Sequence, residues 1–216
     1  MKRFFAAPTT IRGFFVRAMV LMPFVFAAWY LLVPALHWPI RWFLAGMAAL
    51  GYPEFLTQVN QTLAGFELIT SLTPGSMAGQ PFRPDAILTT EIDARIYTWG
   101  TALLATLTLA AWDVARWRYL WYGFLVLLPF QMAAVFAVGM KQMVLASPAV
   151  MAQTDWAQWQ FEATAYLYQF STLMMPPVTA VVVWLVLHRN FVAKFVGADV
   201  IDLIRATEKG TLRKQR

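Results

Sequence analysis

Residue types that carry chemistry are scarce in this sequence. It contains no cysteine, which excludes a thiol nucleophile, a thiolate metal site and a disulfide framework. The two histidines, His37 and His188, fall at opposite ends of apolar segments, so we do not expect them to meet, and each is interpreted as an ordinary interfacial side chain. No serine lies beside a plausible base, and the glycines form no phosphate-binding loop. We therefore expect no catalytic residue, no metal site and no cofactor.

Glu91, Asp93 and Arg95 form a charged group near the end of a strand-like run. The two carboxylates share one face of the predicted strand, and paired carboxylates can act as acid and base. On an exposed hairpin, a solvated face is the simpler interpretation. We regard these three residues as a candidate contact outside the membrane. An enzyme that uses them on a lipid-linked substrate stays open as an alternative.

A second group of polar side chains interrupts long apolar runs. Buried polar groups are costly in lipid and usually face a neighbouring helix or a water-filled cavity. We expect hydrogen bonds between helices from the glutamines, movement of the lysine towards the outer headgroups, and a feasible lysine–glutamate contact. An alternative is a polar transport path lined by that lysine and glutamate. The candidate helix-packing or partner interface consists of Gln131, Lys141, Gln142, Glu162 and Gln169.

The segments that carry these residues have the apolar composition and the length typical of a membrane protein. The 216 residues are 60% hydrophobic and only 13% charged, whereas soluble domains are about half apolar and a quarter charged. About 20 mostly apolar residues are needed to cross the hydrocarbon core. Four segments qualify, at about residues 14–36, 96–112, 120–146 and 161–188. The sequence thus predicts a mainly α membrane protein, a single polytopic domain over residues 1–216.

Lysine and arginine set the expected orientation. With four spans, 13 of the 17 basic residues lie on one side, in the N-terminal segment, the 113–119 link and the tail at 189–216. The positive-inside rule then places both termini of this multi-pass membrane protein in the cytoplasm. The net charge of +6 is explained by this asymmetry and by membrane lipids, so nucleic acid is rejected as a partner.

The largest predicted segment on the outer side of the membrane covers about residues 37–95. It opens with HWPIRWFLAGMAALG, where a proline suits the first helical turn and the aromatic residues suit the headgroup region, so we expect a short interfacial helix. Two alternating runs follow, GFELITSLT and AILTTEID, separated by the turn-rich PGSMAGQPFRPD. They predict a small β-hairpin that leans on other structure.

The order of these features resembles the exosortase H-associated membrane proteins of Gram-negative bacteria. The resemblance is carried by FVFAAWYLLVPALHWPIRWF, AILTTEIDARIYTWGTALLATLTLA, LLPFQMAAVFAVGMKQM and YLYQFSTLMMPPVTAVVVWLVLHRNFV. It implies a role beside an exosortase, a membrane cysteine transpeptidase that processes proteins with a C-terminal sorting signal. This chain lacks the thiol, so the resemblance implies a non-catalytic accessory subunit, with the exosortase as partner and a sorting-signal helix as candidate substrate. A subunit of a small-molecule or polysaccharide transport or channel complex remains the alternative.

Overall fold

The computed structural model describes residues 8, 10–50, 56–73, 87–112, 116–145, 148–154, 156–194 and 197. All of the turn-rich link PGSMAGQPFRPD and most of the predicted basic tail lie outside the described residues. The helices are α1 (Ile11–Leu36), α2 (Trp38–Leu50), α3 (Arg95–Thr98), α4 (Gly100–Ala111), α5 (Arg116–Val144), α6 (Pro148–Met151), α7 (Gln158–Leu173) and α8 (Met175–Leu187). The strands are β1 (Leu56–Gln61), β2 (Phe66–Thr70) and β3 (Thr89–Ile92).

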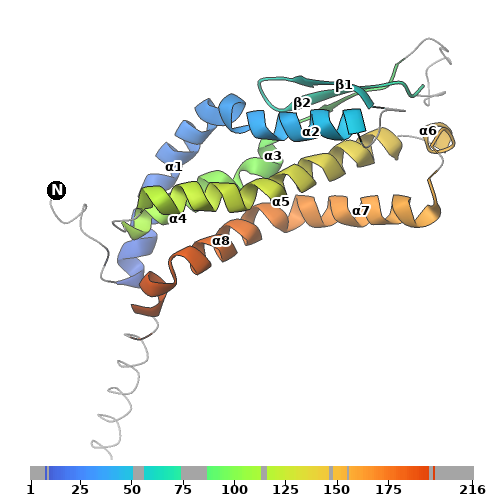
Figure 1. Cartoon of the computed structure of the whole chain (residues 1–216). Helices are drawn as coiled ribbons and strands as arrows, with labels where there is room; N and C mark the ends of the chain where they lie inside the picture. The colour runs from blue at the N-terminus through green and yellow to red at the C-terminus, as the bar shows by residue number, and fades with distance from the viewer. Residues whose placement is uncertain are drawn as a thin grey trace, which may run out of the picture.

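Helix α5 runs through both halves of the molecule (Figure 1). Its C-terminal half lies between the sheet and α7, and its N-terminal half packs against α4 and α8. Two apolar clusters correspond to these halves. The sheet core joins α2, the strands and the part of α5 from Ala134 to Val144, and the helix core joins α1, α4, α8 and Leu127 of α5.

The sheet has the strand order β1-β2-β3, with both pairs antiparallel. The predicted pairing of the two alternating runs is confirmed, since Phe66 lies opposite Ile92 in the β2–β3 register. Phe66, Leu68 and Ile92 are buried towards α5, where Gly139 permits close approach: a Cβ there would lie 2.8 Å from Leu68 Cδ1. Strand β1 was not predicted, and it turns the expected hairpin into a three-stranded sheet.

The first predicted span is a helix that continues, after a turn at His37, into α2. The short helix predicted at the start of the insertion is therefore present. Helix α1 packs on α4 along one face and leaves large apolar side chains exposed on the others, among them Phe24 and Leu31. An apolar surface of this kind suits a lipid environment.

The four predicted spans are only partly supported by the helices. Two helical segments within the described residues are long and apolar enough to cross a membrane, Ile11–Leu50 and Arg116–Val144. A third is obtained if α7 and α8, which meet at a bend of 60°, count as one broken span. The predicted span at 96–112 is interrupted at Trp99, so that α4 has only 12 residues, about 18 Å at 1.5 Å per residue.

The break between α7 and α8 has a covalent cause. Pro176 and Pro177 stand at the start of α8, where their missing N–H groups are tolerated because the first turn of a helix has no intrahelical acceptor for them. The same residues inside a continuous helix would remove hydrogen bonds from the preceding turn. The span predicted at about 161–188 is therefore built from two helices, α7 and α8, with a bend of 60° between them.

Candidate functional site

Gln131 lies on α5 at the boundary of the two apolar cores, between Leu127 and Ala134. Its side chain is only 6% exposed. The Nε2 amide donates to Thr101 Oγ1 at 2.7 Å and to the Thr98 carbonyl at 3.5 Å. These contacts join α5 to the junction of α3 and α4, so the buried amide acts as a bond between helices.

Thr98 extends the same hydrogen-bonded chain to the turn between α1 and α2. Its hydroxyl donates to the Ala94 carbonyl at 3.0 Å and lies 2.9 Å from His37 Nε2. Because a hydroxyl has one proton, His37 Nε2 must be the donor in the second bond, which makes Nδ1 the acceptor nitrogen. Nδ1 is buried and has no hydrogen-bond partner among the described residues.

Asp93 and Arg95 continue the polar region at the start of α3. The guanidinium binds the carboxylate through two contacts, Nε to Oδ1 at 2.8 Å and Nη2 to Oδ2 at 2.6 Å, and Nη1 donates to the Tyr30 hydroxyl at 3.0 Å. The Arg95 hydrogen bond lowers the pKa of Asp93 below its usual range. This pair links the end of β3 to α1.

The name polar layer is used below for two neighbouring hydrogen-bonded groups, one that runs from Gln131 through Thr101 and Thr98 to His37, and one made of the Asp93–Arg95 ion pair and Tyr30. It connects α5, the α3–α4 junction, the α1–α2 turn and the end of the sheet. Its members are Gln131, Thr101, Thr98, His37, Asp93, Arg95 and Tyr30.

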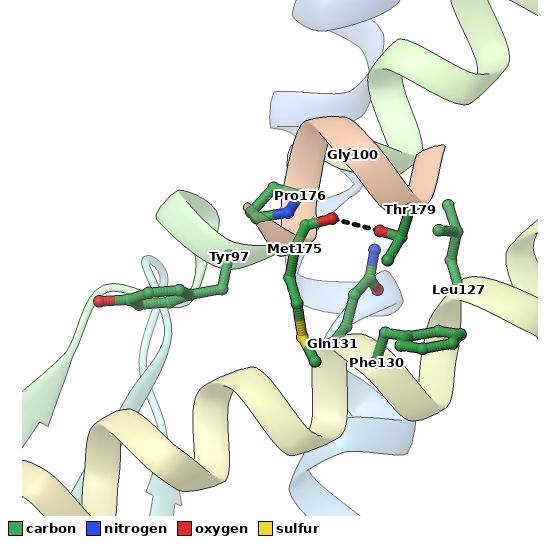
Figure 2. Close-up of a pocket in the computed structure, with 8 residues that line it drawn as sticks. All are labelled: Tyr97, Gly100, Leu127, Phe130, Gln131, Met175, Pro176 and Thr179. Carbon is green, nitrogen blue, oxygen red and sulfur yellow. Dashed lines mark hydrogen bonds between the residues drawn. The ribbon is translucent and has the colours of Figure 1, made fainter. Parts of the chain in front are cut away.

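A narrow hollow lies beside this layer, where α4, α5 and α8 meet, and it leaves no room for a water molecule. Figure 2 shows Gln131 next to Met175 and Thr179, with the Tyr97 hydroxyl directed away from it. Thr179 donates its hydroxyl proton to the Met175 carbonyl. The main feature of the hollow is the close approach of Gly100 to the Pro176 carbonyl.

The remaining predicted interface residues do not form one group. The Lys141 ammonium lies over the Tyr168 ring, with Nζ 4.9 Å from its centroid, and makes no ion pair with Glu162. Glu162 accepts a hydrogen bond from Gln158 Nε2 at 3.0 Å instead. Gln169 is exposed, and Gln142 has a buried Oε1 that lacks a partner among the residues the structure describes.

The structure pairs only two of the three residues in the predicted charged contact, Asp93 and Arg95. Glu91 is exposed and lies opposite Glu67 in the β2–β3 register, and Asn60 Nδ2 donates to Glu67 Oε2 at 3.1 Å. Asp93 is instead engaged by Arg95. The paired-carboxylate chemistry considered for Glu91 and Asp93 therefore finds no shared site. Within the described part of the chain, no group of three or more metal-ligating side chains occurs.

Comparison with protein families matches residues 8–191 to the exosortase H-associated membrane proteins. The chain belongs to this family. No curated protein and no solved structure matches it significantly. The match includes the polar layer, the sheet and both cores of this exosortase H-associated protein.

Sequence reasoning missed several members of the polar layer in this exosortase H-associated protein. Tyr30, Thr98 and Thr101 were not singled out, and His37 was interpreted as interfacial although its ring is fully buried. A signal for Thr98 was present, because a threonine in an apolar helix commonly donates to the carbonyl four residues earlier, here that of Ala94. No local signal identifies its contact with His37, which is 61 residues away.

Proposed function

We propose that this protein is a non-catalytic accessory subunit of the bacterial inner membrane that associates with an exosortase. In this role it assists the sorting or processing of proteins that carry a C-terminal sorting signal. The observation that carries the proposal is the family match over residues 8–191. The exosortase supplies the cysteine of the transpeptidase, since this chain has none.

The polar layer supports a scaffolding role. Its buried members bind one another across elements, as Gln131 does with Thr101 and His37 with Thr98. Buried polar groups that are mutually satisfied specify how elements pack. The layer thereby holds the sheet in a defined position relative to the long helices.

The proposal includes four membrane passes with both termini in the cytoplasm and the sheet in the periplasm. The distribution of 13 of 17 basic residues supports this orientation. Two passes are α1 and the apolar part of α5, and the other two are broken spans, α3 with α4 and α7 with α8. The sheet then lies on the side where an exosortase substrate is cut.

Co-expression with the exosortase of the same cell tests the association. An affinity tag on the exosortase should retain this chain through solubilisation in mild detergent, and deletion of its gene should lower the amount or activity of the exosortase. A tagged membrane protein of similar size serves as the control for non-specific retention. An exosortase that stays fully stable and active without this chain would contradict the proposal.

A further inference from the structure

Strand β1 is a free edge of the sheet. It stands at one end of the order β1-β2-β3, and within the described chain it pairs with β2 alone. The bond from Thr62 N–H to the Gly65 carbonyl, at 2.9 Å, fixes which residues of β1 face β2, because residues of an antiparallel pair alternate between bonded and non-bonded positions. Val59 and Gln61 direct their backbone groups away from β2, and no backbone hydrogen bond of the described chain uses those groups.

The free part of this edge is short and has defined ends. A bulge at Thr57 interrupts the strand on one side, and the hairpin turn follows Gln61 on the other. An antiparallel partner must bring its own outward residues opposite Val59 and Gln61. A second copy of β1, related by a two-fold axis through Asn60, does so, since Val59 then lies opposite Gln61 of the second copy and Gln61 opposite its Val59. Every outward backbone group of this stretch is then paired in both copies.

Asn60, the residue on that axis, has a side chain that complements itself. Its Nδ2 donates to Glu67 Oε2 at 3.1 Å, and its Oδ1 accepts from Gln58 Nε2 at 2.7 Å. A primary amide has two N–H protons and two acceptor lone pairs, so one of each stays open. Two Asn60 side chains in a directly opposite pair can exchange these in reciprocal hydrogen bonds. A second copy therefore matches the edge in its side chains as well as in its backbone.

The two edges of the sheet differ in how they are protected against such pairing. Natural edge strands avoid joining other strands by carrying charged residues or proline. Strand β1, LTQVNQ, has neither. Strand β3, TTEI, carries the exposed Glu91, and pairing of two β3 edges would bring these carboxylates close together. The β3 edge is thus protected by charge, whereas the β1 edge is not.

The geometry of this pairing suits two copies in one membrane. The buried face of the sheet packs on α2 and α5, which lie on one side of it (Figure 1). A two-fold axis perpendicular to the sheet does not exchange its faces, so the helices of both copies stay on the same side of the joined sheet. Neither copy has to be inverted. The paired edge is small, but confinement to one membrane raises the effective concentration of the two copies.

We propose that this protein forms a homodimer in which β1 pairs antiparallel with β1 of a second copy, centred on Asn60. The two three-stranded sheets then form one continuous sheet. This inference goes beyond the proposed function, because the partner at this edge is a second copy of the chain.

The absence of cysteine from the sequence allows the pairing to be measured directly. Opposite residues at a non-bonded position of an antiparallel pair have Cα atoms about 4.5 Å apart, which a disulfide can span. The full chain with Asn60→Cys, oxidised in its membrane with copper phenanthroline, should give a disulfide-linked dimer on a non-reducing gel. Glu91→Cys, on the other edge, is the control and should give at least about fivefold less dimer, because its geometry does not favour a disulfide.

The register has a test of its own. With the axis at Asn60, Gln58 lies opposite Thr62 of the second copy and not opposite another Gln58. Both residues are exposed. Gln58→Cys should therefore link efficiently to Thr62→Cys in a differently tagged, co-expressed copy, and should link poorly to itself. A higher yield of Gln58→Cys with itself than with Thr62→Cys would overturn the pairing centred on Asn60.

A charge at the centre of the pairing gives a readout without cysteine. Asn60→Lys places two ammonium groups opposite each other, so co-purification of an untagged copy with a tagged copy of this variant should fall at least about fivefold. Glu91→Lys introduces the same side chain on the β3 edge and should leave co-purification unchanged. Equal co-purification of wild type and Asn60→Lys would overturn the proposal.

Two further outcomes of the cysteine experiment would overturn the homodimer. One is equal dimer yields from Asn60→Cys and Glu91→Cys, which indicate random collision, or no dimer from Asn60→Cys. The other is a disulfide from Asn60→Cys to a co-expressed exosortase without any dimer, which would assign the edge to that enzyme. The tests of the dimer use this chain alone, so their failure leaves the proposed association with an exosortase standing, and failure of that association leaves the dimer standing.

Discussion

Gln131 makes its closest hydrogen bond, at 2.7 Å, with Thr101, and both side chains come from helices in the middle of the molecule. Changing Gln131 to Leu keeps the volume and removes the amide. We expect the free energy of unfolding to fall by about 1 kcal/mol, the usual range for hydrogen bonds between membrane helices. Thermal or denaturant-induced unfolding in detergent micelles measures this change.

A double-mutant cycle with Thr101→Val separates the hydrogen bond from other effects of the leucine. If the bond is responsible, the two single changes and the double change should destabilise by similar amounts. Additive losses would contradict a direct coupling between the two side chains.

Asp93 should make stability depend on pH. Its pKa is lowered below the ordinary value of 3.8, chiefly by the Arg95 hydrogen bond, so its contribution is present above that value and is lost as the pH falls through the lowered pKa. Asp93→Asn should cost about 1 kcal/mol or less at pH 7, because the pair is partly exposed. The difference in melting temperature between wild type and Asp93→Asn should narrow between pH 7 and pH 3. A constant difference would exclude the carboxylate charge as the cause.

Polar positions were easier to predict than their partners. Gln131, Lys141 and Asp93 stand out in the sequence because each interrupts an apolar or alternating run. The partner of each depends on which face of its helix is turned towards the neighbouring helix. Successive residues of an α-helix are about 100° apart, so an error of one position in the packing directs a side chain to a different neighbour. A contact between Lys141 and Glu162 was judged feasible from depth alone, whereas the observed α5–α7 packing presents Tyr168 to Lys141.

Two glycines in helices provide a matched test of how closely the elements pack. A Cβ at Gly100 would lie 2.5 Å from the Pro176 carbonyl oxygen, whereas a Cβ at Gly46 would meet nothing within 4 Å. Gly100→Ala should therefore separate α4 from α8 and lower the free energy of unfolding by about 1–3 kcal/mol. Gly46→Ala should raise it by up to about 1 kcal/mol through helix propensity. Unfolding of the two variants under identical conditions checks both signs, and a stabilising Gly100→Ala would contradict the observed contact.

Long apolar runs and alternating runs predicted most elements correctly, including α1, α2, α5 and the β2–β3 pair. Strand β1 was missed because LTQVNQ has only two apolar residues and no alternation, and it becomes a strand through its neighbour β2. The breaks at Trp99 and Met174 were also missed. Only the second has a covalent signal, in Pro176 and Pro177.

For the molecule as a whole, the absence of cysteine makes topology easy to measure. Single cysteines can be introduced at Gln58 on β1 and at Arg12 near the start of α1, both exposed. In intact cells with a permeable outer membrane, a membrane-impermeant maleimide should label Gln58→Cys and not Arg12→Cys. Disruption of the inner membrane should then allow both to react. Labelling of Arg12→Cys in intact cells would contradict the proposed cytoplasmic N-terminus.

The sharing of α5 between the two cores has a consequence during synthesis. Strands β1 to β3 leave the ribosome before the part of α5, residues 134–144, that covers them. Until that helix is made, the sheet exposes Phe66, Leu68 and Ile92 to water or to other proteins. Chains that stop before residue 134 should therefore be degraded or held by a chaperone, even though all three strands are complete.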